Sequence, residues 1–199
     1  MTAGEVTVEP VTGTALRDLL PALALLRIEV FRDFPYLYDG TLGYEQRYIA
    51  EFAAAADTVV VVAKAGEEIV GMATASPMLG HADAFAEPFR ERGYDVDRLF
   101  YCGESVLKRT YRGRGIGHAF FDHREAHGRA LGRFTHVTFC GVVRPPDHPL
   151  RPPDYRPLDG FWRKRGYLPL DGVRARFSWK DIDKSEADEK EMQFWIRPL

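Results

Sequence analysis

Three glycines and two arginines alternate within one short stretch, "YRGRGIGHAF", which begins at Tyr111. It follows an apolar segment that reads as a strand and leads into a helical pattern. At a strand-to-helix junction the first helical N–H groups lack partners and the helix dipole favours an anion. Glycines let a ligand approach the backbone closely, and Arg112 and Arg114 can add charge-assisted hydrogen bonds. The stretch indicates a phosphate site, and a tight turn with solvated arginines is the plain alternative.

The spacing of these glycines excludes two common phosphate motifs. A Walker loop requires a lysine directly after its last glycine, and the residue after Gly117 is His118. His118 also stands where a dinucleotide fingerprint needs its third glycine. The pattern that fits is [RQ]-x-x-G-x-[GA], from Arg112 to Gly117.

This motif resembles the acyl-CoA pyrophosphate loop of the GNAT superfamily of N-acyltransferases. In that superfamily a helix, a strand and then a short helix with the box Y-x-x-x-G-[FY] follow the loop. Here "WRKRGY", Trp162 to Tyr167, occupies that place, with Trp162 where tyrosine usually stands. Two helical patterns and an antiparallel hairpin before the loop also match, so the resemblance spans most of the chain. The segments "FPYLYDG", "DGFWRKRGY" and "MQFW" further resemble one bacterial subgroup.

The resemblance implies acetyl-CoA as co-substrate and no metal. It assigns main-chain groups at Val106 and Leu107 to the pantetheine arm, and an N–H near Val106 to polarising the thioester carbonyl. It places the diphosphate on the loop that follows. The residues expected to bind there are Arg112, Gly113, Arg114, Gly115, Ile116, Gly117 and His118.

Members of this superfamily pass the acyl group directly from the thioester to an amine. A lysine-like amine with a pKa of ~10.4 is protonated at neutral pH, so a base must take its proton. Glu104 is the candidate, because it lies in the otherwise uncharged stretch "FYCGESVL". Burial in such a strand predicts a partly desolvated carboxylate with a raised pKa. An edge-exposed or arginine-paired glutamate is the alternative.

The departing thiolate needs a proton, and its usual donor is the tyrosine that Trp162 replaces. An indole N–H is no useful acid, but a thiol pKa of about 8.5 makes the thiolate a tolerable leaving group. Loss of the acid should therefore slow transfer without abolishing it. Tyr155, on the proline-rich stretch upstream, is the candidate substitute, with ordinary surface packing as the alternative.

The resemblance places the acceptor between the turn that joins the first two helices and the segment before the last hairpin. Tyr36, Tyr38 and Asp39 offer rings and a carboxylate to a cationic amine. Other side chains suit an anionic group on the acceptor or the phosphates of CoA: Arg144, Arg151 and Arg156. A solvated turn or lid surface explains each of them equally well.

The resemblance implies an α/β (α+β) protein with the GNAT fold. Its mixed, mostly antiparallel central sheet is flanked by helices, and the parallel fourth and fifth strands splay at the CoA site. The expected helices are 14–34, with a kink or late start at Pro21, then 44–55, 82–92, 117–131 and 158–165. The expected strands are 5–9, 58–63, 69–78, 99–107, 135–143, 174–180 and 192–198, with the acidic run 181–191 as a solvated linker.

Composition sets the remaining expectations. The 199 residues, 45% of them hydrophobic, suit a single domain over 1–199. With 27 Lys plus Arg against 29 Asp plus Glu, the net charge is -2, which favours no nucleic-acid partner. No apolar run reaches the ~18 residues of a membrane helix and no leader pattern stands at the start, so we expect a cytoplasmic protein that contacts no membrane. Cys102 and Cys140 are expected as buried thiols.

Two further side-chain patterns allow more than one interpretation. His123 and His127 lie one helical turn apart, but no third metal ligand has suitable spacing, and the charged residues around them predict a solvated helix face. Those residues are Asp122, Arg124, Glu125 and Arg129. The last strand either packs in its own sheet or pairs with a second copy in a homodimer.

Two functions fit the sequence. The first is an N-acetyltransferase that moves an acetyl group from acetyl-CoA to the primary amine of a small molecule. The alternative is a weak or inactive acyl-CoA-binding sensor or structural module of the same fold, which Trp162 favours. Phosphotransfer is disfavoured because the glycine loop lacks a lysine.

Overall fold

The computed structural model describes residues 5–81 and 83–199. Its seven strands form one sheet in the order β1-β2-β3-β4-β5-β7-β6, in which only the β4–β5 pair is parallel. The strands are β1 (Val6–Val11), β2 (Val59–Ala65), β3 (Glu68–Pro77), β4 (Leu99–Leu107), β5 (His136–Val142), β6 (Leu168–Lys180) and β7 (Ala187–Pro198). The helices are α1 (Leu20–Phe31), α2 (Leu42–Ala54), α3 (Asp83–Arg90), α4 (Ile116–Ala130) and α5 (Asp159–Lys164). This arrangement confirms the predicted fold class.

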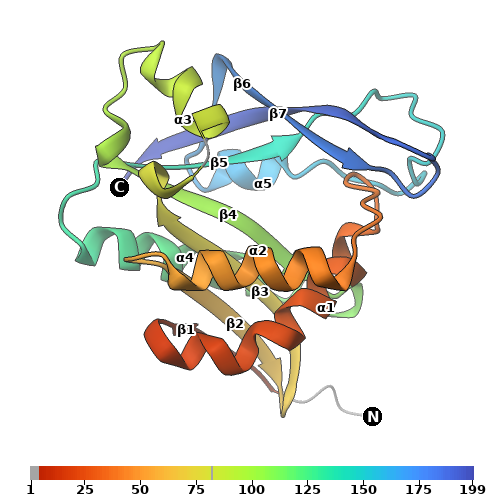
Figure 1. Ribbon diagram of the computed structural model, residues 1–199, viewed down its shortest axis with the longest axis horizontal. Coiled ribbons are helices and arrows are strands. Elements are labelled where there is room, and N and C mark those ends of the chain that lie inside the picture. The colour runs from red at the N-terminus through yellow and green to blue at the C-terminus, as the bar shows by residue number, and fades with distance from the viewer. Residues whose placement is uncertain (1–4, 82) are drawn as a thin grey trace.

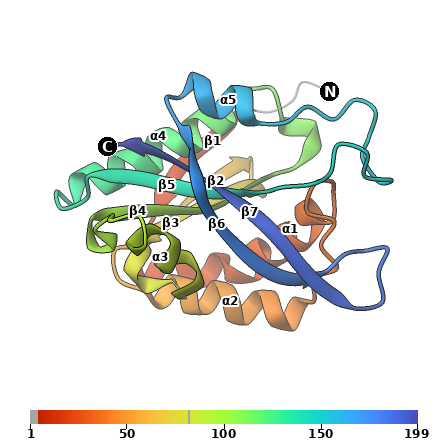
Figure 2. The same ribbon diagram turned by 90° about the horizontal axis from the view of Figure 1, so that it is seen from above.

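Helices cover both faces of the sheet (Figures 1 and 2). The alternation of side chains along β2 shows how the sequence builds the two layers. Val59 and Val61 pack in the core cluster that contains Phe120 of α4. Val60 and Val62 pack in the opposite cluster, beneath α1 and α2. A continuous β-branched run therefore marks a strand buried on both faces.

The first helix starts late, which the proline explains. A 3₁₀ turn covers Gly13–Leu19, and α1 begins at Leu20 with Pro21 in its first turn. Proline is tolerated there because the first helical N–H groups have no partner in any case. The start of the predicted helix 82–92 at Ala82 lies outside the described residues, and α3 runs from Asp83.

The acidic run 181–191 was wrongly predicted to be entirely a solvated linker. Its second half is the start of β7, which pairs with β6 from Lys180↔Ala187 onward. Charged side chains of the two strands form cross-strand ion pairs, among them Arg176 with Glu189 at 3.7 Å. Because these charges neutralise one another across the hairpin, an acidic composition is compatible with a strand here.

The two parallel strands stay together only at one end. Leu99–Tyr101 of β4 pair with residues 136–138 of β5, and in the described part of the sheet β4 has no partner on that side beyond Tyr101. β5 meanwhile continues along β7 as far as Val142. β4 and β5 therefore diverge, as predicted, and residues 102–107 of β4 border an opening.

The two cysteines are confirmed as buried, free thiols. Within residues 5–81 and 83–199, no cluster of three His, Cys, Asp or Glu side chains has a metal-binding arrangement. A search of the same residues finds no helix with the length and apolarity that crossing a bilayer demands.

His81 is a half-buried titratable group on the edge of the core. Its Nε2 lies 2.8 Å from the hydroxyl of Ser76, and its ring packs edge-on against Tyr101 with a centroid distance of 4.7 Å. Burial lowers the pKa of His81 from 6.5 to about 4. Between these two values the unfolded chain binds more protons, so the stability that neutral His81 contributes is present above pH 6.5 and is lost as the pH falls to about 4.

We expect the free energy of unfolding to fall by up to about 3 kcal/mol over this window because of His81 alone. Chemical denaturation between pH 4 and 7 measures it. A His81→Gln variant, which cannot titrate, should give a flatter profile. Identical pH slopes for the two proteins would show that His81 does not cause the acid sensitivity.

Candidate active site

The glycine loop has the backbone conformation that its sequence requires. Gly113 and Gly115 have φ angles of 77° and 82°, in the left-handed region that other residues avoid. Gly117 is different, because it lies in the first turn of α4 and a Cβ there would meet only the Phe161 ring, at 3.6 Å. That is an ordinary contact. The protein itself therefore does not require glycine at 117, and close approach of a ligand is the remaining reason for it.

The loop presents backbone N–H groups that have no partner among the residues that the structure describes. The amide of Arg112 donates to Arg109 O at 3.2 Å, and the amide of His118 donates to Gly115 O at 2.9 Å. Across the described chain, no acceptor is recorded for the amides of residues 113–117. Among the amides predicted to bind the diphosphate, those of residues 113–117 are therefore available to an anion. Those of Arg112 and His118 already donate within the loop.

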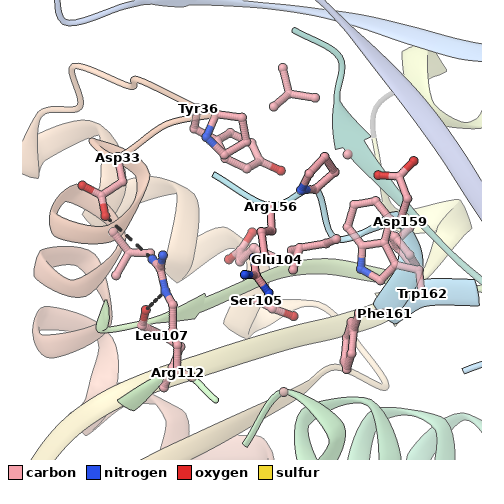
Figure 3. A pocket seen from close by; sticks show the side chains of 18 of the residues that line it. Asp33, Tyr36, Glu104, Ser105, Leu107, Arg112, Arg156, Asp159, Phe161 and Trp162 are labelled. Carbon is pink, nitrogen blue, oxygen red and sulfur yellow. Dashed lines mark hydrogen bonds and ion pairs between the residues drawn. The ribbon is translucent and has the colours of Figure 1, made fainter. Parts of the chain in front are cut away.

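The side chains around the loop are partly engaged. Arg112 Nε donates to Leu107 O at 3.3 Å, and its guanidinium lies 3.8 Å from Asp33 (Figure 3). Arg114 donates to Thr110 O at 2.9 Å. His118 Nδ1 lies 3.1 Å from a guanidinium nitrogen of Arg165. The two loop arginines are exposed and held by weak contacts, so both can turn toward an anion.

A cavity of about 1110 Å³ opens beside the loop, where β4 and β5 diverge (Figure 3). Its walls come from α1 and the turn after it, the second half of β4, the start of α4, the proline-rich loop 144–158 and α5. The predicted site residues that line it are Tyr36, Glu104, Leu107, Arg112, Gly113, Gly115, Gly117, His118 and Tyr155. Among the described residues, the predicted ones outside this lining are Tyr38, Asp39, Val106, Arg114 and Ile116.

Glu104 reaches the cavity from β4 with its carboxylate held on both oxygens. Oε1 lies 2.6 Å from Arg27 Nη1, and Tyr48 donates to Oε2 at 3.3 Å. The side chain is only 9% exposed. The charge of Glu104, and then burial, raise the pKa of Tyr48, so its hydroxyl keeps the proton that it donates. Glu104 is therefore paired with an arginine and at the same time lines the cavity.

Arg27 belongs to a buried group that sequence reasoning missed. Its Nε also forms a short ion pair with Glu45, which is fully buried. Arg27 lies in α1, Glu45 and Tyr48 lie in α2, and Glu104 lies in β4. The two helices thus fix the carboxylate from one side of the sheet. The sequence gives only one sign of this group. Glu45 and Tyr48 are three positions apart in α2, so they share one face of the helix.

Tyr155 lies on the proline-rich loop that lines the cavity. Its ring packs edge-on against Phe34 with a centroid distance of 4.7 Å, and the Arg151 guanidinium lies 5.0 Å from the ring centre. Burial raises the pKa of its hydroxyl, so this group is protonated at neutral pH. The loop therefore bridges to the turn after α1 through an aromatic contact, and Tyr155 is one of the residues that line the cavity.

Trp162 takes the place of the expected tyrosine and acts as a packing residue. Its ring lies 5.0 Å from both Phe139 and Trp195, measured between centroids. A Cβ on Gly141 would lie 2.9 Å from the indole. The indole therefore covers β5 closely and forms an apolar wall of the cavity.

The turn after α1 divides the predicted acceptor residues. Tyr36 lines the cavity, and its ring stacks on Trp179 with a centroid distance of 6.0 Å. Asp39 instead forms ion pairs with Lys180 at 2.5 Å and Arg32 at 3.4 Å. Tyr38 forms a β-bridge to the start of the segment after β6. The structure thus brings Tyr36, but not Tyr38 or Asp39, together with Glu104.

Arg144 holds this turn and is unavailable to a ligand. Its guanidinium forms two hydrogen bonds with Asp181, at 2.7 and 3.0 Å, and donates to the carbonyls of Pro35 and Tyr36 at 2.8 Å each. Lys190 lies 3.2 Å from the same carboxylate. Although burial raises the pKa of Asp181, hydrogen bonds from Arg144 and Lys190 outweigh it, so the pKa lies below the ordinary range. The expectation that Arg144 could bind an anionic group is wrong.

The predicted solvated face of α4 is also partly wrong. Arg124 and Glu125 are buried, at 1% and 3% exposure. Glu125 accepts a hydrogen bond from Tyr167 at 2.9 Å and pairs with Arg165 at 3.2 Å. Residues after β5 pair with Glu125, whereas the guanidinium of Arg124 donates to the backbone carbonyls of Thr74 and Glu104.

Three features together define a protein of the acyl-CoA-dependent acyltransferase class. They are a mixed sheet with two diverging parallel strands, a loop with free amides between strand and helix, and a cavity that holds a carboxylate. Residues 25–152 match the family described as Acetyltransferase (GNAT) family, and the chain belongs to this family. The predicted resemblance is confirmed. No curated protein matches the sequence significantly.

Solved structures share the fold at low sequence identity. Arabidopsis thaliana NAA60 in complex with acetyl-CoA is 14% identical with a TM-score of 0.62, and the alignment covers 98% of this chain and 99% of that one. The structure of yncA from Salmonella typhimurium with its cofactor acetyl-CoA is 10% identical with a TM-score of 0.62, and the alignment covers 98% of this chain and 94% of that one. Ribosomal-protein-alanine N-acetyltransferase from Brucella melitensis is 13% identical with a TM-score of 0.62, and the alignment covers 97% of this chain and 99% of that one. These likenesses establish the fold.

Proposed function

We propose that this protein transfers an acetyl group from acetyl-CoA to the primary amine of a small molecule. One observation carries the proposal: Gly113, Gly115 and Gly117, whose amides have no acceptor among the described residues, line the cavity that also holds Glu104. Family membership supports acetyl transfer as the reaction class.

The residues present suit acetyl-CoA. Unpartnered amides at a helix N-terminus, with Arg112 and Arg114 beside them, bind a diphosphate well. The free edge of β4 over residues 102–107, which includes Leu107, offers backbone groups to the pantetheine arm. Val106 pairs with Met72 of β3, so its own backbone groups point away from this edge. When bound, acetyl-CoA supplies the thioester whose acyl carbon the amine attacks.

Glu104 is our candidate for the general base. It takes the proton of the ammonium group, directly or through one water, so that the amine nitrogen can bond to the acyl carbon as the C–S bond breaks. Arg27 and Tyr48 fix the direction of the carboxylate. An N–H on the edge of β4 near Val106 stabilises the negative charge that develops on the carbonyl oxygen.

Tyr155 is our candidate for the acid that protonates the departing sulfur. A Tyr155→Phe variant should lower kcat by roughly 10-fold and leave measurable activity, because a thiolate with a pKa near 8.5 departs without full protonation. Steady-state assays of thiol release measure this. Tyr111→Phe, outside the lining of this cavity, is the matched control and should match the wild type. Unchanged turnover in Tyr155→Phe would remove the assignment.

The acceptor site we propose lies between Tyr36 and the proline-rich loop. Tyr36 offers an aromatic wall, and Arg156 points from the loop toward β4 (Figure 3) without an ion pair to any described residue. Arg156 suits an anionic group on the acceptor or a phosphate of CoA. Tyr38 and Asp39 lie outside the cavity lining, so their positions do not support a role in binding the acceptor.

The alternative, an acyl-CoA-binding module without turnover, is favoured by Trp162 in the tyrosine position. Release of free CoA thiol from acetyl-CoA with a panel of small amines separates the two functions. We expect amine-dependent release with at least one amine. Saturable acetyl-CoA binding without release on any amine would support the module. A cytoplasmic location stays an expectation from the sequence. The last strand, β7, pairs with both β5 and β6 in its own sheet, so it is no edge for a second copy, and a homodimer has no support from it.

A further inference from the structure

The side chains of β4 change faces in the middle of the strand. In a regular strand, Cys102 and Glu104 would point to the same side of the sheet. Cys102 packs in the core cluster that contains Phe120 of α4. Glu104 contacts Arg27 of α1, on the opposite face. An irregularity between the two residues is therefore what turns Glu104 toward the helices α1 and α2.

The irregularity is a β-bulge between β3 and β4. Ala73 pairs with Ser105 and Ala75 pairs with Cys102, so Thr74 alone faces both Gly103 and Glu104. A bulge of this kind disrupts the ladder and leaves backbone groups without their usual partners. The amide of Glu104 donates instead to the side-chain hydroxyl of Thr74, at 3.1 Å.

Arg124 supplies the missing donors from the other side of the sheet. Its Nη1 donates to both bulge carbonyls, Thr74 O at 3.3 Å and Glu104 O at 3.2 Å. Its Nε donates to Phe120 O of its own helix at 3.2 Å. A buried carbonyl without a donor is unfavourable, so the bulge and the guanidinium stabilise each other.

The cost of burying Arg124 shows that it does more than fill space. The residue is 1% exposed, and no carboxylate in the described chain forms an ion pair with it. One of its nitrogens, Nη2, has no hydrogen-bond partner. The Phe121 ring, whose centre lies 4.5 Å from the guanidinium carbon, offsets part of the cost of burying a cation without an ion pair. An apolar side chain would fill the same volume without that cost. An apolar side chain, however, cannot donate hydrogen bonds to the two carbonyls of Thr74 and Glu104.

We propose that Arg124 is a positioning residue for acetyl transfer. By holding the β4 bulge from the α4 side, it directs Glu104 into the acceptor side of the cavity, where Arg27 and Tyr48 receive the carboxylate. The inference rests on the proposed role of Glu104 as base.

A double-mutant cycle tests this. Arg124→Met should lower kcat by 10-fold to 100-fold and leave the Kd for CoA within about 2-fold, because the diphosphate loop is separate from the bulge. Arg124→Lys should recover at least half of the loss on a logarithmic scale, because an ammonium can donate to both carbonyls. Arg129→Met, an exposed arginine of the same helix, is the matched control and should keep the wild-type kcat.

The decisive comparison uses the Glu104→Gln background. There Arg124→Met should cause no further loss of kcat, because its effect passes through the carboxylate. An equal loss in both backgrounds, or a wild-type kcat for Arg124→Met, overturns the inference while leaving the proposed function intact. If Glu104→Gln itself keeps the wild-type kcat, the base assignment fails and the inference fails with it. Should Arg124→Met not fold, Thr74→Val removes the acceptor of the Glu104 amide and enters the same cycle.

Discussion

Replacing Gly117 by Asp should lower the affinity for CoA by about 100-fold or more, roughly 3 kcal/mol, without destabilising the protein. A side chain fits at this position, since a Cβ meets only the Phe161 ring at 3.6 Å. A carboxylate in the first turn of α4 interacts favourably with the helix dipole, so the free protein keeps its thermal midpoint or gains slightly. The same carboxylate repels the diphosphate and occupies its amides. Calorimetric titration with CoA and a thermal melt measure both effects.

Gly117→Asn is the matched control for this variant. It has nearly the same volume but no charge, so we expect a clearly smaller loss of affinity. Equal Kd values for CoA in Gly117→Asp and the wild type would show that the diphosphate does not bind at the start of α4.

Glu104→Gln should lower kcat by about 10²- to 10⁴-fold, the range that removal of a general base usually gives. The amide keeps the size of the side chain but cannot accept the ammonium proton. The Kd for CoA should stay unchanged, because Glu104 lies away from the glycine loop. Steady-state kinetics from pH 6 to 10 measure the loss, which should shrink at high pH as the free amine becomes more abundant.

Glu68→Gln, an exposed glutamate on β3 that pairs with Lys108 at 2.7 Å, is the control and should behave as the wild type. A wild-type kcat for Glu104→Gln over the whole pH range would exclude the carboxylate as the base.

The diphosphate loop could be predicted from the sequence because all its parts are contiguous. The strand end at Leu107, the left-handed glycines at 113 and 115 and the helix start at Ile116 follow one another, and local sterics determine each. The sheet was predictable for a similar reason, since the β-branched run of β2 faces a core on both sides.

The surroundings of Glu104 could not be predicted, because they come together only through the fold. Arg27 and Tyr48 lie far from Glu104 in the sequence, Tyr48 by 56 positions, and nothing near Glu104 in the sequence indicates a counter-charge. Arg124 was placed on a solvated face because helical periodicity cannot show which segments later cover a helix. Likewise Asp181, at the start of an acidic run, is fully buried because Arg144 and Lys190 neutralise it.

The central claim is that the free amides of residues 113–117 bind the diphosphate of an acyl-CoA. Calorimetric titration with acetyl-CoA and with S-acetylpantetheine, which carries the same thioester but no diphosphate, tests it most directly. We predict one acetyl-CoA site per chain and at least about 100-fold weaker binding of S-acetylpantetheine. Equal affinities for the two compounds, or no binding of acetyl-CoA, would contradict the claim.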